Sequence, residues 1–204
     1  MSERVLVIGA GIGGLCTALS LAGSGRAVTL LERDVAPPGD DPDTVFEDWH
    51  RRGAGHIRQS HAFLARLREI IRARHPRLLD DLKTMGARDL TFDVMLTEAQ
   101  RETYTPEPGD SELTIITSRR TTLELALRRY VESLDNVDIR SGFFVRGLLT
   151  HQGEDGVLEV SGVAGECDEV PEEMTADIIV DASGKSGFTL EQLIKDGASI
   201  AEEG

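Results

Sequence analysis

Three glycines near the start of the chain have a spacing that can hold a diphosphate group. In such a pattern the first glycine permits a tight turn out of a strand, and the second lets a pyrophosphate approach the backbone. The third lets the following helix pack closely on that strand. The free N–H groups and the positive dipole end of the helix then attract the phosphates. We therefore predict a dinucleotide diphosphate site at Gly9, Gly11, Ile12, Gly13 and Gly14.

Glu32 supplies the second part of the same pattern. It stands near the end of the apolar stretch "AVTLLER", residues 27–33. A carboxylate after the second strand of such a unit can accept hydrogen bonds from both hydroxyls of an adenosine ribose, and it repels a 2′-phosphate. We expect Glu32 to contact the ribose of the dinucleotide.

These residues need a strand, a turn, a helix and a second strand to position them. Residues 4–8 predict a short buried strand, residues 12–22 repeat small and apolar side chains at helical spacing, and residues 27–33 predict the second strand. The uncharged run of residues 5–22 raises the alternative of a secretion signal. Its glycines weaken an isolated apolar helix, and the preceding residues are not basic. The dinucleotide site is therefore favoured.

The composition is that of a protein with one ordinary core and an acidic surface. The 204 residues are 40% hydrophobic and 28% charged, and the formal net charge is −14. This charge argues against nucleic acid and against an anionic membrane surface as partners. Cys16 and Cys167 have no metal-binding spacing, so we expect both to be reduced and structural in a cytoplasmic protein.

Positive charge is concentrated in residues 51–77, which hold eight arginines and a single acid. Part of this segment predicts an amphipathic helix whose outer arginines form a solvated face. The preceding loop, "GHIRQSH", differs because Arg58, Gln59 and His61 offer several donors for an anionic or flavin-like ligand. The histidines of the segment do not indicate a metal site, because no carboxylate or cysteine is spaced to complete one.

The rest of the chain predicts an α/β fold, a Rossmann-like parallel sheet with one antiparallel β crossover. Helices are expected at residues 76–87 and 121–134, and strands at 89–96, 112–118 and 137–140. Residues 143–152 and 156–163 predict a β-hairpin around "GEDG". The apolar stretch 176–184 ends in small residues, as expected of a parallel strand whose carboxyl end faces a ligand.

At this point the sequence resembles a family, the flavoprotein monooxygenases and related oxidoreductases of the para-hydroxybenzoate hydroxylase and geranylgeranyl reductase type. The glycine triplet is followed by the pair Glu32-Arg33, as in that family. The stretch "FEDWHRRGAGHIRQSHAFL" is similar to its Trp-x-Arg-x-Gly-x-x-x-x-x-Gln-x-His pattern. "SRRTTLE" resembles the stretch whose arginine opens a helix beside the flavin, and Arg120 fits that spacing better than Arg119.

The segment "ADIIVDASGKSG" resembles the strand and turn in which the family's Asp and Gly approach the cofactor. The resemblance implies FAD as the cofactor and NADPH or NADH as a reductant. It implies cofactor contacts by Arg33, Arg58, Gln59, Arg120, Asp181 and Gly184, beside the glycine loop and Glu32. This chain departs from the family in two places, with Ser183-Gly184 where many relatives have Asp-Gly, and with Lys185 where arginine is usual.

Family members continue with a substrate-covering sheet and a later Gly-Asp motif, and no such motif follows Gly187 in this sequence. We therefore expect an FAD-binding domain over residues 1–187, with a helical insertion at 43–86, and a short tail at 188–204. The chain would then be an N-terminal fragment, a truncated reading frame or one half of a split enzyme. A second chain supplying the substrate domain is an expected partner.

Two classes of function remain open from the sequence. The first is an FAD-dependent oxidoreductase, a monooxygenase or reductase of a small organic substrate. The second is a non-catalytic dinucleotide-binding fragment, or a Rossmann protein that binds NAD. Glu32 is compatible with either dinucleotide, whereas the antiparallel crossover and the segments around Arg58 and Arg120 favour FAD. No residue of the chain is identified as a protein nucleophile.

Overall fold

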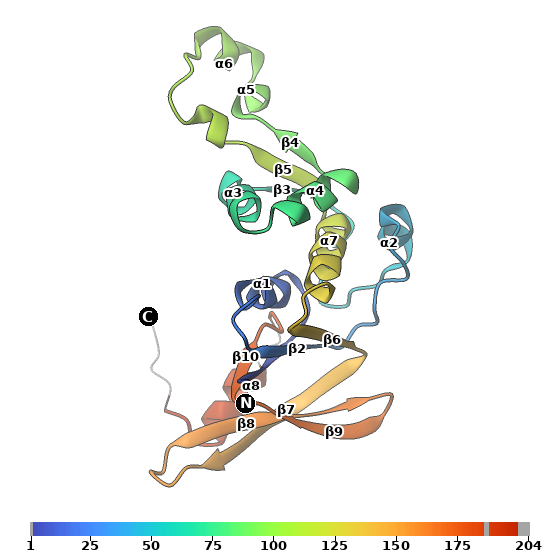
Figure 1. Cartoon of the computed structure of the whole chain (residues 1–204), viewed down its shortest axis with the longest axis vertical. Coiled ribbons are helices and arrows are strands. Elements are labelled where there is room, and N and C mark those ends of the chain that lie inside the picture. Colours follow the sequence, from blue (N-terminus) through green and yellow to red (C-terminus); the bar gives the residue numbers. More distant parts are fainter. Residues whose placement is uncertain (1, 186–187, 200–204) are drawn as a thin grey trace. The chain divides into compact units, whose positions relative to one another are not determined.

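The computed structural model describes residues 2–185 and 188–199, and the chain divides into two compact units (Figure 1). Unit 1 combines Met1–Ala36 with Arg128–Gly204, and unit 2 is the intervening segment Pro37–Leu127. The domain boundary expected at residue 187 lies outside the described residues. The extents expected for the FAD-binding domain and its insertion stay predictions.

Unit 1 is built on a four-stranded parallel sheet with the strand order β10-β1-β2-β6 (Figure 1). The strands are β1 (Arg4–Ile8), β2 (Ala27–Glu32), β6 (Val137–Ser141) and β10 (Ile178–Asp181). The two central strands are apolar and mostly buried, as expected where both faces of a parallel sheet are covered. This sheet confirms the predicted α/β class.

Helix α1 (Ile12–Ser20) connects the first two strands and is two residues shorter than predicted. Its small and apolar side chains face the sheet, and Leu15 and Ala18 are fully buried. The chain then turns through Gly23 and Gly25, both of which have positive φ angles. These glycines allow the reversal into β2 because only glycine enters that region at little cost.

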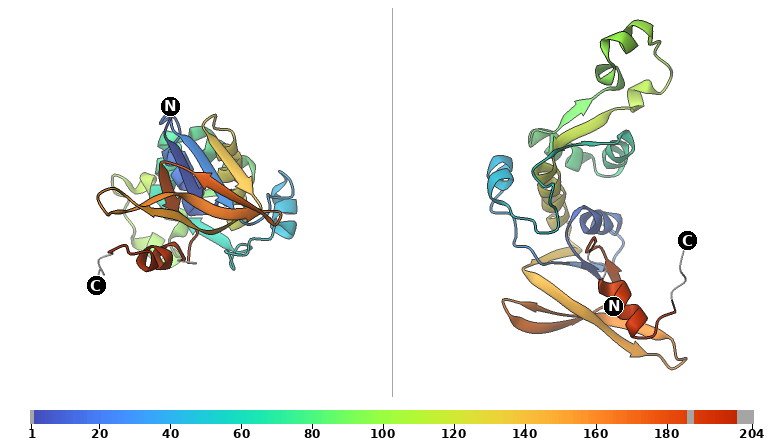
Figure 2. Two further views of the ribbon diagram at one scale, coloured as in Figure 1. Left: turned by 90° about the horizontal axis from the view of Figure 1, so that it is seen from below. Right: turned by 180° about the vertical axis from the view of Figure 1, so that it is seen from behind.

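The crossover from β6 to β10 consists of antiparallel strands, as the sequence predicts. Strands β7 (Phe143–Gln152), β8 (Leu158–Cys167) and β9 (Val170–Thr175) form a sheet in that order. Figure 2 shows this sheet lying across the parallel strands, and Leu148 and Val163 pack with Leu6, Ile8 and Leu31 in a shared core. The third strand was not expected, because it falls in a charged, proline-containing stretch whose alternation is weak.

Helix α8 (Phe188–Lys195) also lies outside the predicted elements. The Gln192 side chain fastens it to β7, donating to the Leu148 carbonyl at 2.9 Å and accepting from the Leu148 N–H at 2.8 Å. Near the end of the helix, the Thr150 hydroxyl donates to Asp196 at 3.0 Å. Figure 2 shows α8 beside the antiparallel sheet.

Unit 2 is a small α/β unit whose three strands form an antiparallel sheet with the order β3-β5-β4. Helix α7 (Arg120–Glu132) begins in this unit and runs on into unit 1. The remaining elements are α2 (Pro42–Asp48), β3 (Ser60–Phe63), α3 (Ala65–Arg74), α4 (Pro76–Thr84), β4 (Arg88–Leu90), α5 (Phe92–Met95), α6 (Glu98–Thr103), η1 (Asp110–Glu112) and β5 (Ile115–Arg119).

One local prediction for unit 2 was wrong, and one helix was not expected. The strand expected at residues 89–96 ends at Leu90, because Thr91 starts the short helix α5 and Asp93 stands in its first turn. The polar segment after it contains α6, which begins with a capping box between Thr97 and Gln100. The start of α6 follows the capping-box rule, whereas Thr91 at the start of α5 makes no side-chain capping hydrogen bond.

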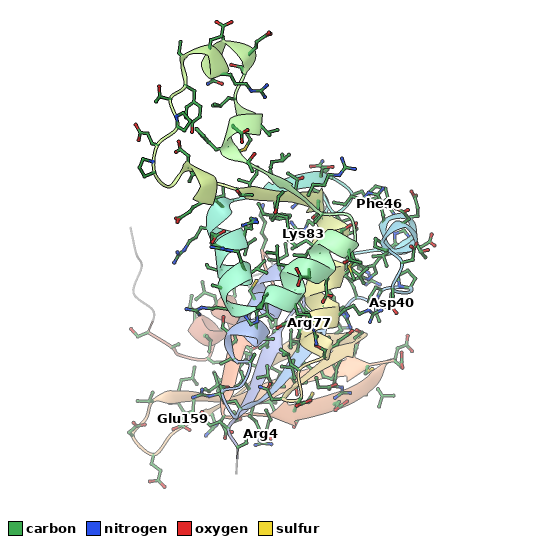
Figure 3. All side chains as sticks on the ribbon, turned by 45° about the horizontal axis from the view of Figure 1, so that its top comes forward. Arg4, Asp40, Phe46, Arg77, Lys83 and Glu159 are labelled. Carbon is green, nitrogen blue, oxygen red and sulfur yellow. The ribbon has the colours of Figure 1, made fainter. Side chains whose placement is uncertain are left out.

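The arginine-rich face of α3 is only partly the solvated surface that its pattern predicts. Arg66 and Arg74 are exposed, but Arg68 is half-buried and donates to both oxygens of Asp89, at 2.9 and 2.8 Å. Lys83 of α4, labelled in Figure 3, reaches the same carboxylate at 2.9 Å. The hydrogen bonds from Arg68 and Lys83 lower the pKa of Asp89 to about 2.

Candidate dinucleotide-binding site

Gly9 forms the turn between β1 and α1, where two independent features require glycine. Its φ is +97°, a region that L side chains rarely adopt. A Cβ at this position would lie 2.8 Å from the Ala182 carbonyl oxygen, which is too close for any side chain. The Gly9 N–H donates to the Leu31 carbonyl at 2.7 Å, so the turn is also fixed to β2.

Gly14 and Gly11 serve different purposes in the first turn of α1. A Cβ on Gly14 would lie 1.9 Å from the Gly9 carbonyl oxygen, so this glycine allows the close packing of helix on strand that the pattern predicts. Gly11 is the N-cap residue and has an ordinary extended backbone, with φ −78° and ψ −171°. Backbone conformation therefore does not explain glycine at position 11.

The start of α1 fits an anionic group. It has no side-chain hydrogen bond at its cap and no acidic residue in its first turn. The absence of a side chain on Gly11 leaves the backbone open at the helix end that carries positive partial charge. These features of residues 9–14 fit the diphosphate of FAD.

Glu32 lies directly against the glycine loop, as the sequence pattern requires. It is only 4% exposed, at the end of β2. One carboxylate oxygen accepts a hydrogen bond from the Ala10 N–H at 2.9 Å, and the other accepts from the Asp34 N–H at 2.9 Å. The carboxylate is thus fixed in orientation beside the loop, and its contact with a ribose stays a prediction.

The end of β10 lies next to the same loop. Asp181 is in register with Ile8 of β1, and the Ala182 N–H donates to the Ile8 carbonyl at 2.9 Å. The Asp181 carboxylate accepts hydrogen bonds from the Ser183 N–H at 2.8 Å and from the Thr189 hydroxyl of α8. Gly184 follows with a φ of +82° and open space around it. Unit 1 therefore brings the end of β10 to the glycine loop, where Ala182 and Ser183, the residues between Asp181 and Gly184, lie closest to Gly9.

The hydrogen bonds to Asp181 keep its carboxylate ionised. Burial by itself would raise the pKa of Asp181, but the hydrogen bonds from Ser183 and Thr189 outweigh burial and hold the pKa below its ordinary value. Asp181 is thus an ordered anion beside the loop.

Arg120, at the start of α7, belongs to a mostly buried polar cluster within unit 2. Its Nε donates to Glu124 at 2.8 Å, and its guanidinium also contacts His56. Glu124 is 1% exposed and lies 3.4 Å from the Nε of Arg51. Arg119, in contrast, pairs with the exposed Asp43 at 2.6 Å. The cofactor contact of Arg120 stays a prediction.

Arg58 has a structural role that the sequence did not reveal. Its guanidinium donates to the carbonyls of Phe46, at 2.9 Å, and Glu47, both in the last turn of α2. These carbonyls lack partners within a helix, so Arg58 caps α2, on which Figure 3 labels Phe46. The Gln59 side chain is exposed, and its carbonyl accepts from the Arg120 N–H at 3.1 Å.

The predicted site residues thus fall into two groups, one in each unit. Unit 1 gathers the glycine loop, Glu32, Asp181 and Gly184, with Arg33 exposed after β2. Unit 2 holds Arg58, Gln59 and Arg120. Sequence reasoning missed Thr189, because nothing in the pattern indicates that a residue after the last strand reaches back to Asp181.

The described residues contain no group of histidine, cysteine, aspartate and glutamate side chains that could hold a metal ion. Within the same part of the chain, no helix is long and apolar enough to cross a membrane.

Comparison with known proteins agrees with the geometry of the glycine loop. Residues 4–95 match the family model described as FAD dependent oxidoreductase. Over these residues the chain is therefore similar to the FAD-dependent oxidoreductases. The family is described by its dependence on FAD, so this similarity points to FAD as the cofactor.

Individual relatives are longer than this chain. Protein Rv3254 of Mycobacterium tuberculosis is 32% identical over 194 residues, which cover 90% of this chain and 38% of that protein. The myxobacterial halogenase CndH, described as a variant of FAD-dependent halogenases, is 25% identical with a TM-score of 0.62, over 91% of this chain and 38% of its own.

A third relative shows the fold alone. PqsL, a probable FAD-dependent monooxygenase from Pseudomonas aeruginosa, has a TM-score of 0.62 at 14% identity, over 100% of this chain and 48% of its own. The chain therefore spans less than half the length of each of these three proteins.

Proposed function

We propose that the chain binds FAD at the glycine loop of unit 1 and forms the FAD-binding portion of a monooxygenase or reductase that acts on a small organic substrate. The observation that carries the proposal is the start of α1. Gly11 has no conformational need to be glycine, and it stands where an anion meets the N-terminus of the helix. The family match over residues 4–95 supports FAD as that ligand.

Each residue group has a distinct part in this proposal. The backbone of residues 9–14 binds the diphosphate, and Glu32 accepts hydrogen bonds from the adenosine ribose. In unit 1, Asp181, Gly184 and Arg33 are proposed as further cofactor contacts, and the contacts that the family resemblance implies for Arg120, Arg58 and Gln59 stay predictions. FAD supplies the redox chemistry when bound, and the protein orients it and sets its electrostatic environment.

The finer parts of the proposal concern the reductant, the partner and the location. NADPH or NADH is the proposed reductant, and a second chain is the proposed source of the substrate-covering part. Both cysteines are free thiols, which agrees with a cytoplasmic setting. The competing hypothesis is an NAD-binding or non-catalytic unit that uses the same loop.

The experiment that separates these hypotheses is the identification of the bound dinucleotide. The purified 204-residue chain should have flavin absorbance, and denaturation should release FAD. A colourless chain that binds NAD but not FAD in calorimetric titration would contradict the proposal.

The glycine loop itself is tested by Gly11→Val. The valine side chain would occupy the space through which the diphosphate approaches, so FAD affinity should fall by at least about 100-fold, the loss expected when a ligand cannot reach its backbone donors. Gly39→Val is the matched control, because Gly39 has open space around it and lies outside the loop. Unchanged FAD affinity in Gly11→Val, measured by fluorescence titration, would show that the site is elsewhere.

A further inference from the structure

Ala182 and Ser183, which directly follow β10, lie against one side of the glycine turn. The Ala182 carbonyl oxygen lies 2.8 Å from the point where a Cβ on Gly9 would stand, and the Ala182 N–H donates to the Ile8 carbonyl. A Cβ on Gly13 would likewise lie 3.9 Å from the Ala182 side chain. Residues 182 and 183 therefore limit the space beside Gly9 and Gly13 on this side of the loop.

Asp181 fixes the conformation of this segment through both of its carboxylate oxygens. One oxygen accepts from the Ser183 N–H at 2.8 Å, which closes a local turn two residues long. The other accepts from the Thr189 hydroxyl, which comes from the next element, α8. Thr189 is only 7% exposed, so its hydroxyl has little access to water as an alternative partner.

Helix α8 is in turn anchored to a rigid part of unit 1. Gln192 makes two hydrogen bonds to the backbone of Leu148 in β7, and Thr150 of β7 donates to Asp196. The chain of contacts from β7 through α8 and Thr189 to Asp181 is continuous within one unit. Through these contacts β7 and α8 hold the segment after β10 in place, in addition to the local turn between Asp181 and Ser183.

We propose that Thr189 is a positioning residue of the dinucleotide site. Its hydroxyl orients the Asp181 carboxylate and thereby holds residues 182–184 against the glycine loop. Its role in cofactor affinity rests on the proposed function, because it concerns the same site. The role of Thr189 in ordering residues 182–184 is independent of the proposed function, because these hydrogen bonds form without a ligand.

The structure offers a closely matched control. Thr150 and Thr189 each donate a hydroxyl hydrogen bond to an aspartate, and both bonds fasten α8. The Thr150 bond joins the far end of the helix to β7, whereas the Thr189 bond joins its first turn to β10. Thr189→Val and Thr150→Val therefore remove the same type of bond from the same helix, but only one of them reaches the segment beside the glycine loop.

The first measurement is amide hydrogen exchange of the FAD-free chain. In Thr189→Val the Ser183 amide should exchange at least about tenfold faster than in the parent, because a carboxylate without its second donor no longer holds the turn. Thr189→Ser, which keeps the hydroxyl, should restore the parent rate, and Thr150→Val should leave it unchanged. Equal rates in the parent and both valine variants would overturn the proposal.

If Thr189→Val does not fold, the parent decides the question. A Ser183 amide that exchanges in the parent as fast as an unprotected loop residue would overturn the proposal. Protection of that amide in both the parent and Thr189→Ser would support it.

The second measurement is FAD affinity by fluorescence titration, with the melting temperature of each variant recorded in parallel. Thr189→Val should bind FAD about tenfold more weakly, whereas Thr150→Val should lose stability without losing affinity. Equal loss of affinity in both variants would show a general structural effect and would overturn the positioning role. If the parent does not bind FAD, the proposed function is contradicted. The exchange measurement on the FAD-free chain still tests whether Thr189 orders residues 182–184.

Discussion

At the scale of single residues, two glycines of the first loop are required by the fold, and a third has a backbone conformation open to any residue. Gly9 is required by its positive φ and by the nearby Ala182 carbonyl. Gly14 is required by the packing of α1 on the strand that precedes it. Gly11 has an ordinary extended backbone, so its conformation does not require glycine, and this position carries the functional proposal.

The contrast between Gly14 and its neighbour in α1 gives a stability prediction. Gly14→Ala would place a methyl group 1.9 Å from the Gly9 carbonyl oxygen, and backbone must move to admit it. We expect the free energy of unfolding to fall by about 3 kcal/mol, at the upper end of overpacking effects. The measurement is urea unfolding followed by circular dichroism.

Gly13→Ala is the matched control for this prediction. The added methyl group would meet the Ala182 side chain at 3.9 Å, an ordinary contact, and alanine is the better helix former. This variant should be neutral or stabilised by up to about 1 kcal/mol. Similar losses in both variants would contradict the packing argument.

At the scale of elements, the Gln192 side chain holds α8 in place by hydrogen bonding to the backbone of a strand. Gln192 makes the pair of hydrogen bonds that a neighbouring strand would make with Leu148 of β7. A Cβ on Gly147 would lie 3.1 Å from the Gln192 side chain, so the glycine leaves room for this contact. The attachment of α8 therefore combines this amide with the packing of Phe188 and Leu193 against the core of unit 1.

Replacing that amide tests the attachment. In Gln192→Ala both backbone groups of Leu148 lose a partner, so we expect a loss of about 2 kcal/mol in the free energy of unfolding. Glu191→Ala changes the adjacent, exposed residue of α8 and should have an effect below about 0.5 kcal/mol. Denaturant unfolding of the two variants compares them directly, and equal losses would count against the role of Gln192.

Acid sensitivity within unit 2 is predicted to depend on Asp89 of β4. Hydrogen bonds from Arg68 and Lys83 lower its pKa from 3.8 to about 2. Because the folded-state pKa is depressed, the stabilisation is fully present above about pH 5 and is lost as the pH falls through about 2. It amounts to about 2 kcal/mol in the free energy of unfolding.

Asp89→Asn removes this titration. The difference in free energy of unfolding between the parent and Asp89→Asn should be constant above pH 5 and should shrink between about pH 4 and pH 2, the range between the two pKa values. Urea unfolding at a series of pH values provides the test. A difference that does not change across that range would contradict the assignment.

At the scale of the whole molecule, the dominant feature is a formal net charge of −14 on 204 residues. The ion pairs of α3 and α4 neutralise carboxylates locally, yet the excess of acids acts on the compact state as self-repulsion. This charge opposes association with nucleic acid and with anionic lipid, and it makes salt a stabilising agent.

Raising NaCl from about 0.01 M to 0.15 M shortens the Debye length from about 30 to 8 Å, which screens this repulsion. We expect the melting temperature at pH 7 to rise as a result. Near pH 5, where partial protonation of carboxylates reduces the net charge, the increase should be smaller. A melting temperature that falls with salt at pH 7 would show that the screened ion pairs contribute more than the repulsion.

The amino-acid sequence by itself determined the first strand, turn and helix, the position of Glu32 beside the loop, and the antiparallel crossover into β10. These features follow from local rules, because glycine spacing, apolar runs and alternation act over a few neighbouring residues. The strand expected at residues 89–96 was wrong because apolar alternation over eight residues does not exclude a single helical turn, and residues 92–95 form one.

Only the tertiary structure decided which side chains meet across long separations. The sequence does not show that Thr189 reaches Asp181, that Arg58 caps α2, or that Arg68 pairs with Asp89. Each of these contacts joins two elements whose relative placement depends on the packing of the surrounding core. Hydrogen bonds need a distance and direction that no spacing along the chain specifies, so they appear only once the elements are packed.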